Sequence, residues 1–203
     1  MRLRVFVLAA ALAVAGAASA QQSDPANGLF LIAKPGLVDP NFRQTVVLVT
    51  QAQDYSTVGV IINRPTQLKL DVLLRGDAAA TRYRDAVFFG GPVMPEVIVS
   101  LFRSDSPPEA AAFPVLKDLY LSLHPQNLRA LLIADGKRYR LYAGFSGWAP
   151  RQLQSEMQRD GWYVLPADIE IIFRESMENV WQELVHRAEK RPIAWQGEPA
   201  LAK

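Results

Sequence analysis

Two runs rich in β-branched residues constrain the fold of this chain more than any other feature. Residues 45–50 and 58–62 contain no charged side chain, which is typical of strands that are covered on both faces. The polar stretch of residues 51–56 between them has the length of a hairpin connection. The chain is therefore expected to build a sheet with packed layers on both sides.

Shorter patterns extend this sheet and add helices. We expect further strands at residues 29–33, 86–89, 97–102, 119–123, 139–143, 162–165 and 169–173, and helices at residues 68–74, 125–134 and 150–159. A last helix follows Ser176, a suitable N-cap, and has apolar residues at three- and four-residue spacing. These are Met177, Val180, Trp181, Leu184, Val185 and Ala188. The order of elements predicts an α+β fold: a compact mixed β-sheet, partly barrel-like, flanked by helices, with an amphipathic C-terminal helix.

The first 20 residues predict an export signal. A basic start with Arg2 and Arg4 precedes an apolar run at residues 5–18, and Ala18-Ser19-Ala20 follows, which is the layout of a cleaved signal peptide. We expect cleavage after Ala20 and a periplasmic or secreted mature chain. No stable membrane anchor is expected, because the run is shorter than the ~20 residues that span a bilayer. The chain has no cysteine, which agrees with export and excludes thiolate sites.

Residues 21–203 are expected to form a single domain, or two lobes joined by the loop 103–114, where prolines and serines break regular structure. Without Arg2 and Arg4, the 22 basic residues fall to 20 and balance the 20 acidic residues. Basic residues are densest at 137–140 and form no long run. Nucleic-acid binding normally needs a basic face with several phosphate contacts, so a nucleic-acid partner is not expected.

Several short strings in the mature chain, in this order, resemble the YqgE/AlgH family of small bacterial proteins. They are LFLIAKP at residues 29–35, DPNF at 39–42, GVIINRP at 59–65, FGGPV at 89–93, and Gly144 with GWAP at 147–150, QL at 152–153, Trp162 and PAD at 166–168. The chain departs from the family pattern at Arg151, where glycine is usual, and at Gln51 or Gln53 and after Phe102, where histidines are common. The resemblance implies a compact α/β protein with a mixed sheet and no accepted catalytic residues.

The same strings contain the candidate binding residues. Arginine is a good bidentate partner for carboxylates, and asparagine supplies both a donor and an acceptor. One interpretation is structural, with Arg64 pairing with an acid such as Asp39 and pinning two loops. The other is functional, with a small anionic ligand or a partner's tail bound there. The candidates are Asn41, Arg43, Asn63, Arg64, Gly90, Gly91 and Trp148.

The residues that could carry catalysis or hold a metal do not form a recognisable set. Ser146 follows an expected strand, but its G-x-S-G string is not the G-x-S-x-G of a nucleophile elbow, and only His186 follows it. His124 and His186 are far apart in sequence, and His124 is placed to cap the helix that Pro125 begins. Glycine-rich phosphate-binding motifs are also absent from the sequence. We therefore expect no metal and no cofactor.

These observations favour a non-enzymatic YqgE/AlgH-like protein that binds a partner protein or a small anionic ligand in the cell envelope. Two other classes of function stay open. One is a transcriptional regulator, which is the label that one branch of the family carries. The other is an uncharacterised hydrolase, which would need a pocket that joins Ser146 to a histidine.

Overall fold

The computed structural model describes residues 28–136 and 138–190, so the expected signal at residues 1–20 lies outside the described residues. In this part of the chain the strands are β1 Leu29–Ala33, β2 Val46–Gln51, β3 Thr57–Ile61, β4 Phe88–Phe89, β5 Val93–Arg103, β6 Phe113–Leu116, β7 Leu119–Ser122, β8 Tyr139–Trp148 and β9 Trp162–Pro166. The helices are α1 Leu70–Leu73, α2 Pro125–Ile133, α3 Gln152–Gln158, α4 Ile169–Ile172 and α5 Val180–Lys190, with a 3-10 helix, η1, at Ala78–Arg82.

All nine strands belong to one sheet with the order β6-β7-β5-β8-β3-β2-β1-β9, and β4 pairs with β8 outside this path. The β4–β8 pair is parallel and the other pairs are antiparallel. The long strand β8 joins the two halves, because its C-terminal part pairs with β3 and most of its length pairs with β5. The expected α+β fold with a mixed sheet is confirmed. The barrel-like closure is not, because β6 and β9 are edge strands that do not pair with each other in the described chain.

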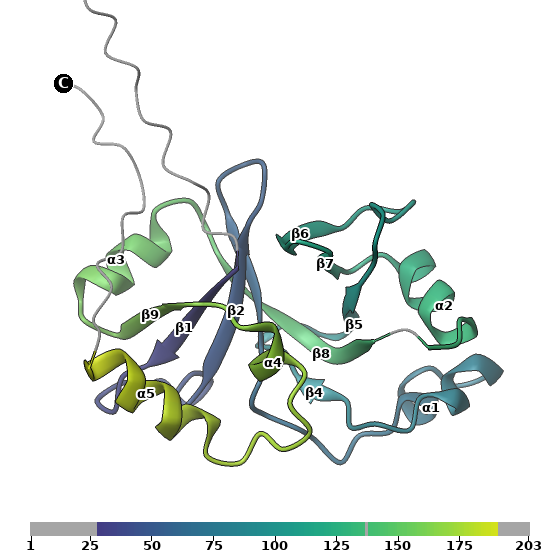
Figure 1. The fold of residues 1–203 in the computed structure, drawn as a ribbon, viewed down its shortest axis with the longest axis horizontal. Coiled ribbons are helices and arrows are strands. Elements are labelled where there is room, and N and C mark those ends of the chain that lie inside the picture. Colours follow the sequence, from purple (N-terminus) through teal and green to yellow (C-terminus); the bar gives the residue numbers. More distant parts are fainter. Residues whose placement is uncertain (1–27, 137, 191–203) are drawn as a thin grey trace, which may run out of the picture.

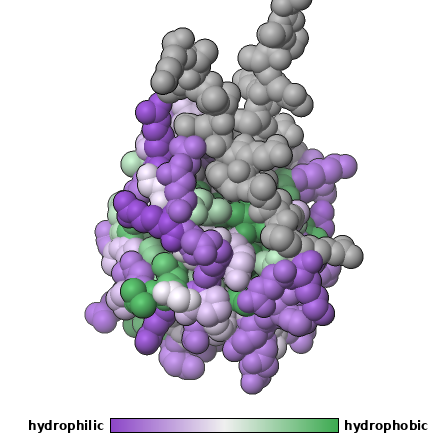
Figure 2. Space-filling view, turned by 90° about the vertical axis from the view of Figure 1, so that its left-hand side faces the viewer, coloured by the Kyte–Doolittle hydropathy of each residue, from purple (hydrophilic) through white to green (hydrophobic). Residues whose placement is uncertain are grey.

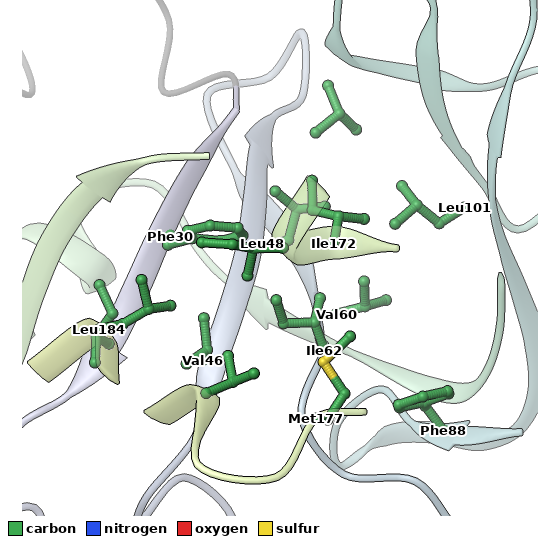
Figure 3. Close-up of a cluster of buried hydrophobic side chains, with 14 of the residues drawn as sticks. Phe30, Val46, Leu48, Val60, Ile62, Phe88, Leu101, Ile172, Met177 and Leu184 are labelled. Atoms are coloured by element: carbon green, nitrogen blue, oxygen red, sulfur yellow. The ribbon is translucent and has the colours of Figure 1, made fainter. Parts of the chain in front are cut away.

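The concave face of the sheet carries the largest core cluster. The segment that contains α4 and α5 packs against this face (Figure 1) and contributes Ile172, Met177 and Leu184. These side chains meet alternate residues from both halves of the sheet, as Figure 3 shows. The labelled strand residues are Phe30, Val46, Leu48, Val60, Phe88 and Leu101, with Ile62 directly after β3.

Two smaller clusters cover the opposite face. One lies between β1, β2, β3, β9 and α3 and includes Leu31, Val47 and Leu153. The other packs α1, η1 and α2 against β5 and β8 and includes Leu70, Leu128 and Leu141. Strands β1, β2 and β3 are therefore buried on both faces, which explains their nearly continuous apolar sequence.

Several expected elements differ from the structure. The expected strand at residues 169–173 is wrong: α4 forms there, since the Asp168 carboxylate accepts a 2.9 Å hydrogen bond from the Glu170 amide and caps the helix despite its isoleucines. Strand β6 lies partly within the expected loop 103–114, and its Pro114 is tolerated because β6 is an edge strand. Ser176 accepts from the Glu178 amide at 3.2 Å, but α5 begins only at Val180.

Candidate functional site

Asn63 and Arg64 follow Ile62 just beyond the end of β3, and their side chains contact the segment that leads into β2. The Asn63 Oδ1 accepts a hydrogen bond from the Val46 amide at 2.8 Å, and its Nδ2 donates to the Gln44 carbonyl at 3.0 Å. One side chain thus satisfies two main-chain groups where β2 begins, next to Gln44, which has a left-handed φ of 56°. Asn63 therefore fixes the end of the β1–β2 connection.

Arg64 binds the same connection from the side. Its Nη1 donates to the Asn41 carbonyl at 2.6 Å and its Nη2 donates to the Arg43 carbonyl at 2.9 Å. The expected ion pair with Asp39 is wrong, because the Asp39 carboxylate instead accepts from the Asn41 amide at 2.8 Å. Arg64 does pin two loops, but it does so through carbonyl oxygens, the other acceptors available to a guanidinium.

The charges around this connection are unbalanced. Burial lowers the pKa of Arg64 from its ordinary value, the positive charge of Arg43 lowers it further, and Asp39 acts in the opposite direction. Arginine stays protonated at neutral pH even so. The half-buried guanidinium of Arg64 is therefore exposed to the positive charge of Arg43, whose side chain is exposed to solvent.

Gly90 and Gly91 lie where β3 meets β8. The Gly90 carbonyl accepts from the Ile61 amide at 2.9 Å and from the Ser146 hydroxyl at 3.1 Å, and its amide donates to the Ala143 carbonyl at 2.9 Å. A side chain at Gly90 would collide with the Gly144 carbonyl, and one at Gly91 would collide with the main chain of Phe145. The glycine pair therefore passes so close to the main chain of β8 that a side chain at either position would collide with it.

Trp148, the last residue of β8, belongs to an aromatic cluster beneath the β1–β2 connection. Phe42 lies between Trp148 and Trp162. The centre of its ring is 5.8 Å from that of Trp148 and 5.6 Å from that of Trp162. Both indole nitrogens donate to Glu156 Oε2 on α3, at 2.9 Å from Trp148 and 3.2 Å from Trp162. Trp148 is 3% exposed, so it anchors the connection from inside the protein and offers little surface to a ligand.

The structure thus brings the candidate residues together around one connection. Arg64 bonds the carbonyls of Asn41 and Arg43, and Trp148 packs on the neighbouring Phe42. The glycine pair is linked to the same place, because the Phe89 amide donates to the Arg64 carbonyl at 2.9 Å. Of this set, only Asn41 and Arg43 are exposed side chains for which the structure records no hydrogen bond.

Ser146, the serine considered for hydrolysis, lies within β8 and not at a strand-to-helix elbow. Its side chain is fully buried and donates to the Gly90 carbonyl. His186 is exposed on α5, whereas the His124 Nδ1 accepts from the Gln126 amide at 3.2 Å. The expected capping role of His124 is confirmed. The Ser146 hydroxyl forms a hydrogen bond that links β8 to the main chain of Gly90.

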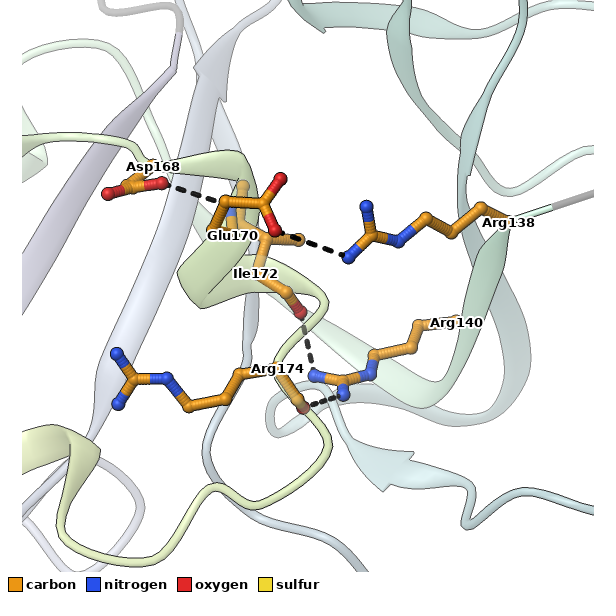
Figure 4. Close-up of polar contacts among 6 residues, drawn as sticks. All are labelled: Arg138, Arg140, Asp168, Glu170, Ile172 and Arg174. Atoms are coloured by element: carbon orange, nitrogen blue, oxygen red, sulfur yellow. Dashed lines mark hydrogen bonds and ion pairs between the residues drawn. The ribbon is translucent and has the colours of Figure 1, made fainter.

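Arg140 is an important residue that the sequence reasoning missed. Its side chain is buried beneath α4, where Nη1 donates to the Ile172 carbonyl at 2.7 Å and Nη2 donates to the Arg174 carbonyl (Figure 4). Its guanidinium also lies 4.7 Å from the centre of the Phe88 ring. The sequence showed only that basic residues are densest at 137–140, and this density did not distinguish the buried Arg140 from the exposed Arg138.

No group of three or more His, Asp or Glu side chains among residues 28–136 and 138–190 is arranged to hold a metal ion. Within the same ranges, every helix is too short or too polar for a membrane crossing.

Comparison with known proteins supports the family resemblance that the short sequence strings suggested. Residues 30–192 match the AlgH-like family model, DUF179. A UPF0301 protein of Anaeromyxobacter sp. (strain K) is 35% identical over 168 residues, which cover 78% of this chain and 85% of that protein. A UPF0301 protein of Methylococcus capsulatus is 37% identical over 158 residues, covering 75% and 84%.

Solved structures give the same result at the level of the fold. The solution structure of the AlgH protein from Pseudomonas aeruginosa matches with a TM-score of 0.67 and 25% identity, covering 89% of this chain and 97% of that chain. A crystal structure of a protein from Corynebacterium diphtheriae matches with a TM-score of 0.61 and 23% identity, covering 81% and 87%. The chain therefore belongs to the AlgH-like (UPF0301) family.

Proposed function

We propose that the protein is a non-enzymatic binding protein of the cell envelope that holds an anionic group, from a small ligand or a partner protein, at Arg43 and Arg64. The observation that supports this is the pair of guanidinium groups at the β1–β2 connection. Neither forms an ion pair with a carboxylate of the described residues, and the charge of Arg43 disfavours that of Arg64. An anion placed between them removes this repulsion.

The connection is rigid enough to present Arg43 without a large ordering cost. Its main chain is fixed by Arg64, by Asn63 and by the Asp39 carboxylate, and its Phe42 is inserted into an aromatic cluster. A loop held in this way loses little conformational entropy when a ligand binds, which favours binding. Exposed loop residues on a rigid scaffold are also where binding residues concentrate.

A titration with small anions tests the proposed site. The probes are inorganic phosphate and acetate, followed through the amide chemical shifts of Asp39 and of residues 41–44 in the mature chain. We expect saturable shifts, and we expect the affinity for the anion to fall at least tenfold in Arg43→Gln because the guanidinium is lost. The side chain of Arg43 is exposed and its carbonyl contact with Arg64 is retained, so this substitution should leave the fold unchanged. Arg75→Gln, another exposed arginine, should leave the titration unchanged. Equal binding by Arg43→Gln and the unsubstituted chain would contradict the proposal.

Arg64→Ala separates the two roles of Arg64. Its loss frees the carbonyls of Asn41 and Arg43, so we expect both weaker anion binding and a lower melting temperature. A lower melting temperature with unchanged anion binding would leave Arg64 a purely structural role.

The envelope location rests on the sequence pattern of residues 1–20. Mass spectrometry of the protein from cells that express the full chain should find a mature N-terminus at Gln21 in the exported fraction. Cytosolic protein that retains Met1–Ala20 would contradict this part of the proposal, and would leave the anion-binding test unaffected.

A further inference from the structure

Strand β9 forms one edge of the sheet, and the pattern of its hydrogen bonds shows which groups face outward. The Lys34 amide donates to the Gly161 carbonyl at 3.0 Å and the Ala167 amide donates to the Gly28 carbonyl at 2.7 Å. With the antiparallel register that pairs Ile32 with Tyr163, the residues of β9 that bond β1 are Tyr163 and Leu165. The main-chain groups of Trp162, Val164 and Pro166 therefore point away from the sheet.

These outward groups have no hydrogen-bond partner in the described chain. The opposite edge differs, because the Pro114 carbonyl of β6 accepts a 2.7 Å hydrogen bond from the Thr50 hydroxyl and Pro114 has no amide hydrogen. Proline and covered carbonyls are ways in which proteins protect an edge strand from pairing. In the described chain β6 is thus blocked at Pro114, whereas β9 keeps two outward amides, those of Trp162 and Val164, and lacks an outward donor only at its last residue, Pro166.

We propose that β9 is an interface with a second copy of this chain, in which two β9 strands pair antiparallel about a two-fold axis at Val164. The two Val164 residues then exchange reciprocal N–H···O=C bonds. The Trp162 amide donates to the carbonyl of Pro166 of the partner subunit, which offers an acceptor and needs no outward donor. A two-fold interface requires a self-complementary surface, and this donor and acceptor pattern is self-complementary.

The charges at the two ends of β9 suit the antiparallel arrangement. The Pro166 end leads into Asp168 and Glu170, both acidic. The Trp162 end follows Arg159 and lies beside Lys34, which is ion-paired with Asp160. A two-fold axis at Val164 brings the acidic end of each strand to the more basic end of the other, which favours this register electrostatically.

The layers beside β9 supply further contact area. Helix α5 packs on one side of β9, and α3 covers the other side through the cluster that contains Val164 and Trp162. Figure 2 views the molecule from the side on which these elements lie in Figure 1, and hydrophobic residues are visible there between hydrophilic ones. Pairing of the strands places each helix next to its symmetry mate.

The test uses the mature full-length chain and two substitutions at one position. Val164→Pro removes the outward donor and changes the buried side chain, but it leaves the bonds to β1, because the Val164 amide does not bond β1. Val164→Ala keeps the donor and changes the same buried side chain, so it is the matched control. We expect light scattering to give a dimer mass for the unsubstituted chain and for Val164→Ala, and at least tenfold weaker association for Val164→Pro. A dimer that persists in Val164→Pro, or a monomeric unsubstituted chain at millimolar concentration, would overturn the proposal.

Amide hydrogen exchange keeps the proposal testable even where Val164→Pro fails to fold. The Val164 and Trp162 amides of the unsubstituted chain should be protected at high protein concentration and should lose protection on dilution. Protection that does not depend on concentration would overturn the proposal. So would a monomeric full chain that dimerises only after removal of residues 191–203, since the chain's own C-terminal residues would then compete for the edge.

Discussion

Replacement of Arg140 by methionine is the sharpest test of how α4 is held on the sheet. The buried guanidinium donates to the carbonyls of Ile172 and Arg174, which lie at and just beyond the C-terminal end of α4. Methionine fills a similar volume but has no donor. The substitution therefore leaves two carbonyl oxygens without their partner while the apolar contact with Phe88 is largely kept.

The expected loss follows from these two bonds. A hydrogen bond from a charged donor contributes about 1.5–3 kcal/mol, and the removal of a buried positive charge returns part of this, because its desolvation was costly. We therefore expect Arg140→Met to lower the free energy of unfolding by about 2–4 kcal/mol, measured by urea denaturation followed by tryptophan fluorescence and by circular dichroism.

Arg138→Met is the matched control on the same strand. Arg138 lies 3.8 Å from Glu170, and both side chains are on the surface, 45% and 76% exposed, so its loss should cost no more than about 1 kcal/mol. Equal effects of the two substitutions, or an Arg140→Met variant more stable than the unsubstituted chain, would refute the reasoning. The buried charge would then cost more than its two hydrogen bonds contribute.

Three further outcomes follow from single contacts. Arg151 has a left-handed φ of 68°, so Arg151→Gly should raise the free energy of unfolding by roughly 1 kcal/mol in the same urea assay; a loss would show that the arginine's own contacts dominate. Burial raises the pKa of Tyr83 and of Tyr142 above the ordinary value, so the fold favours the neutral phenols and loses this stability only as the pH rises past that value of about 10; while the fold persists, the rise in absorbance at 295 nm near pH 11 should therefore be the same in Tyr83→Phe as in the unsubstituted chain, and a smaller rise in the variant would contradict the burial argument. Glu156→Gln keeps one acceptor oxygen but removes the charge shared by two indoles, and should shift tryptophan emission with a modest loss of stability, whereas an unchanged emission spectrum would argue against the shared contact.

The sequence predicted most of the fold because its strands and helices follow local patterns. The apolar runs of β2 and β3 and the stripe of α5 report burial directly. The error at residues 169–173 has a local cause as well, since the three isoleucines of this segment favour a strand and one capping carboxylate, that of Asp168, outweighs them. Whether the sheet closes into a barrel depends on how close its two edge strands come in space, and no local sequence pattern carries that information.

The candidate residues were named from the sequence, but the way they meet and their chemistry required the structure. In the sequence, Asn63 and Arg64 look like ligand-binding residues. In the structure, their side chains instead donate hydrogen bonds to main-chain carbonyls of the β1–β2 connection. Gly90 forms main-chain hydrogen bonds to both β3 and β8 where these two strands meet. A residue type does not show whether its partner is a ligand or a neighbouring carbonyl, because the donor geometry is the same in both cases.

Arg43 carries the remaining argument for binding. The contacts of Asn63, Arg64 and Trp148 stabilise the β1–β2 connection, so a loss of function after their substitution would not distinguish a binding role from a folding role. The side chain of Arg43 is exposed and only its carbonyl is used by the fold. Arg43→Gln therefore removes the charge of this side chain while the free energy of unfolding stays almost constant. This makes it the substitution that distinguishes a role in binding from a role in folding.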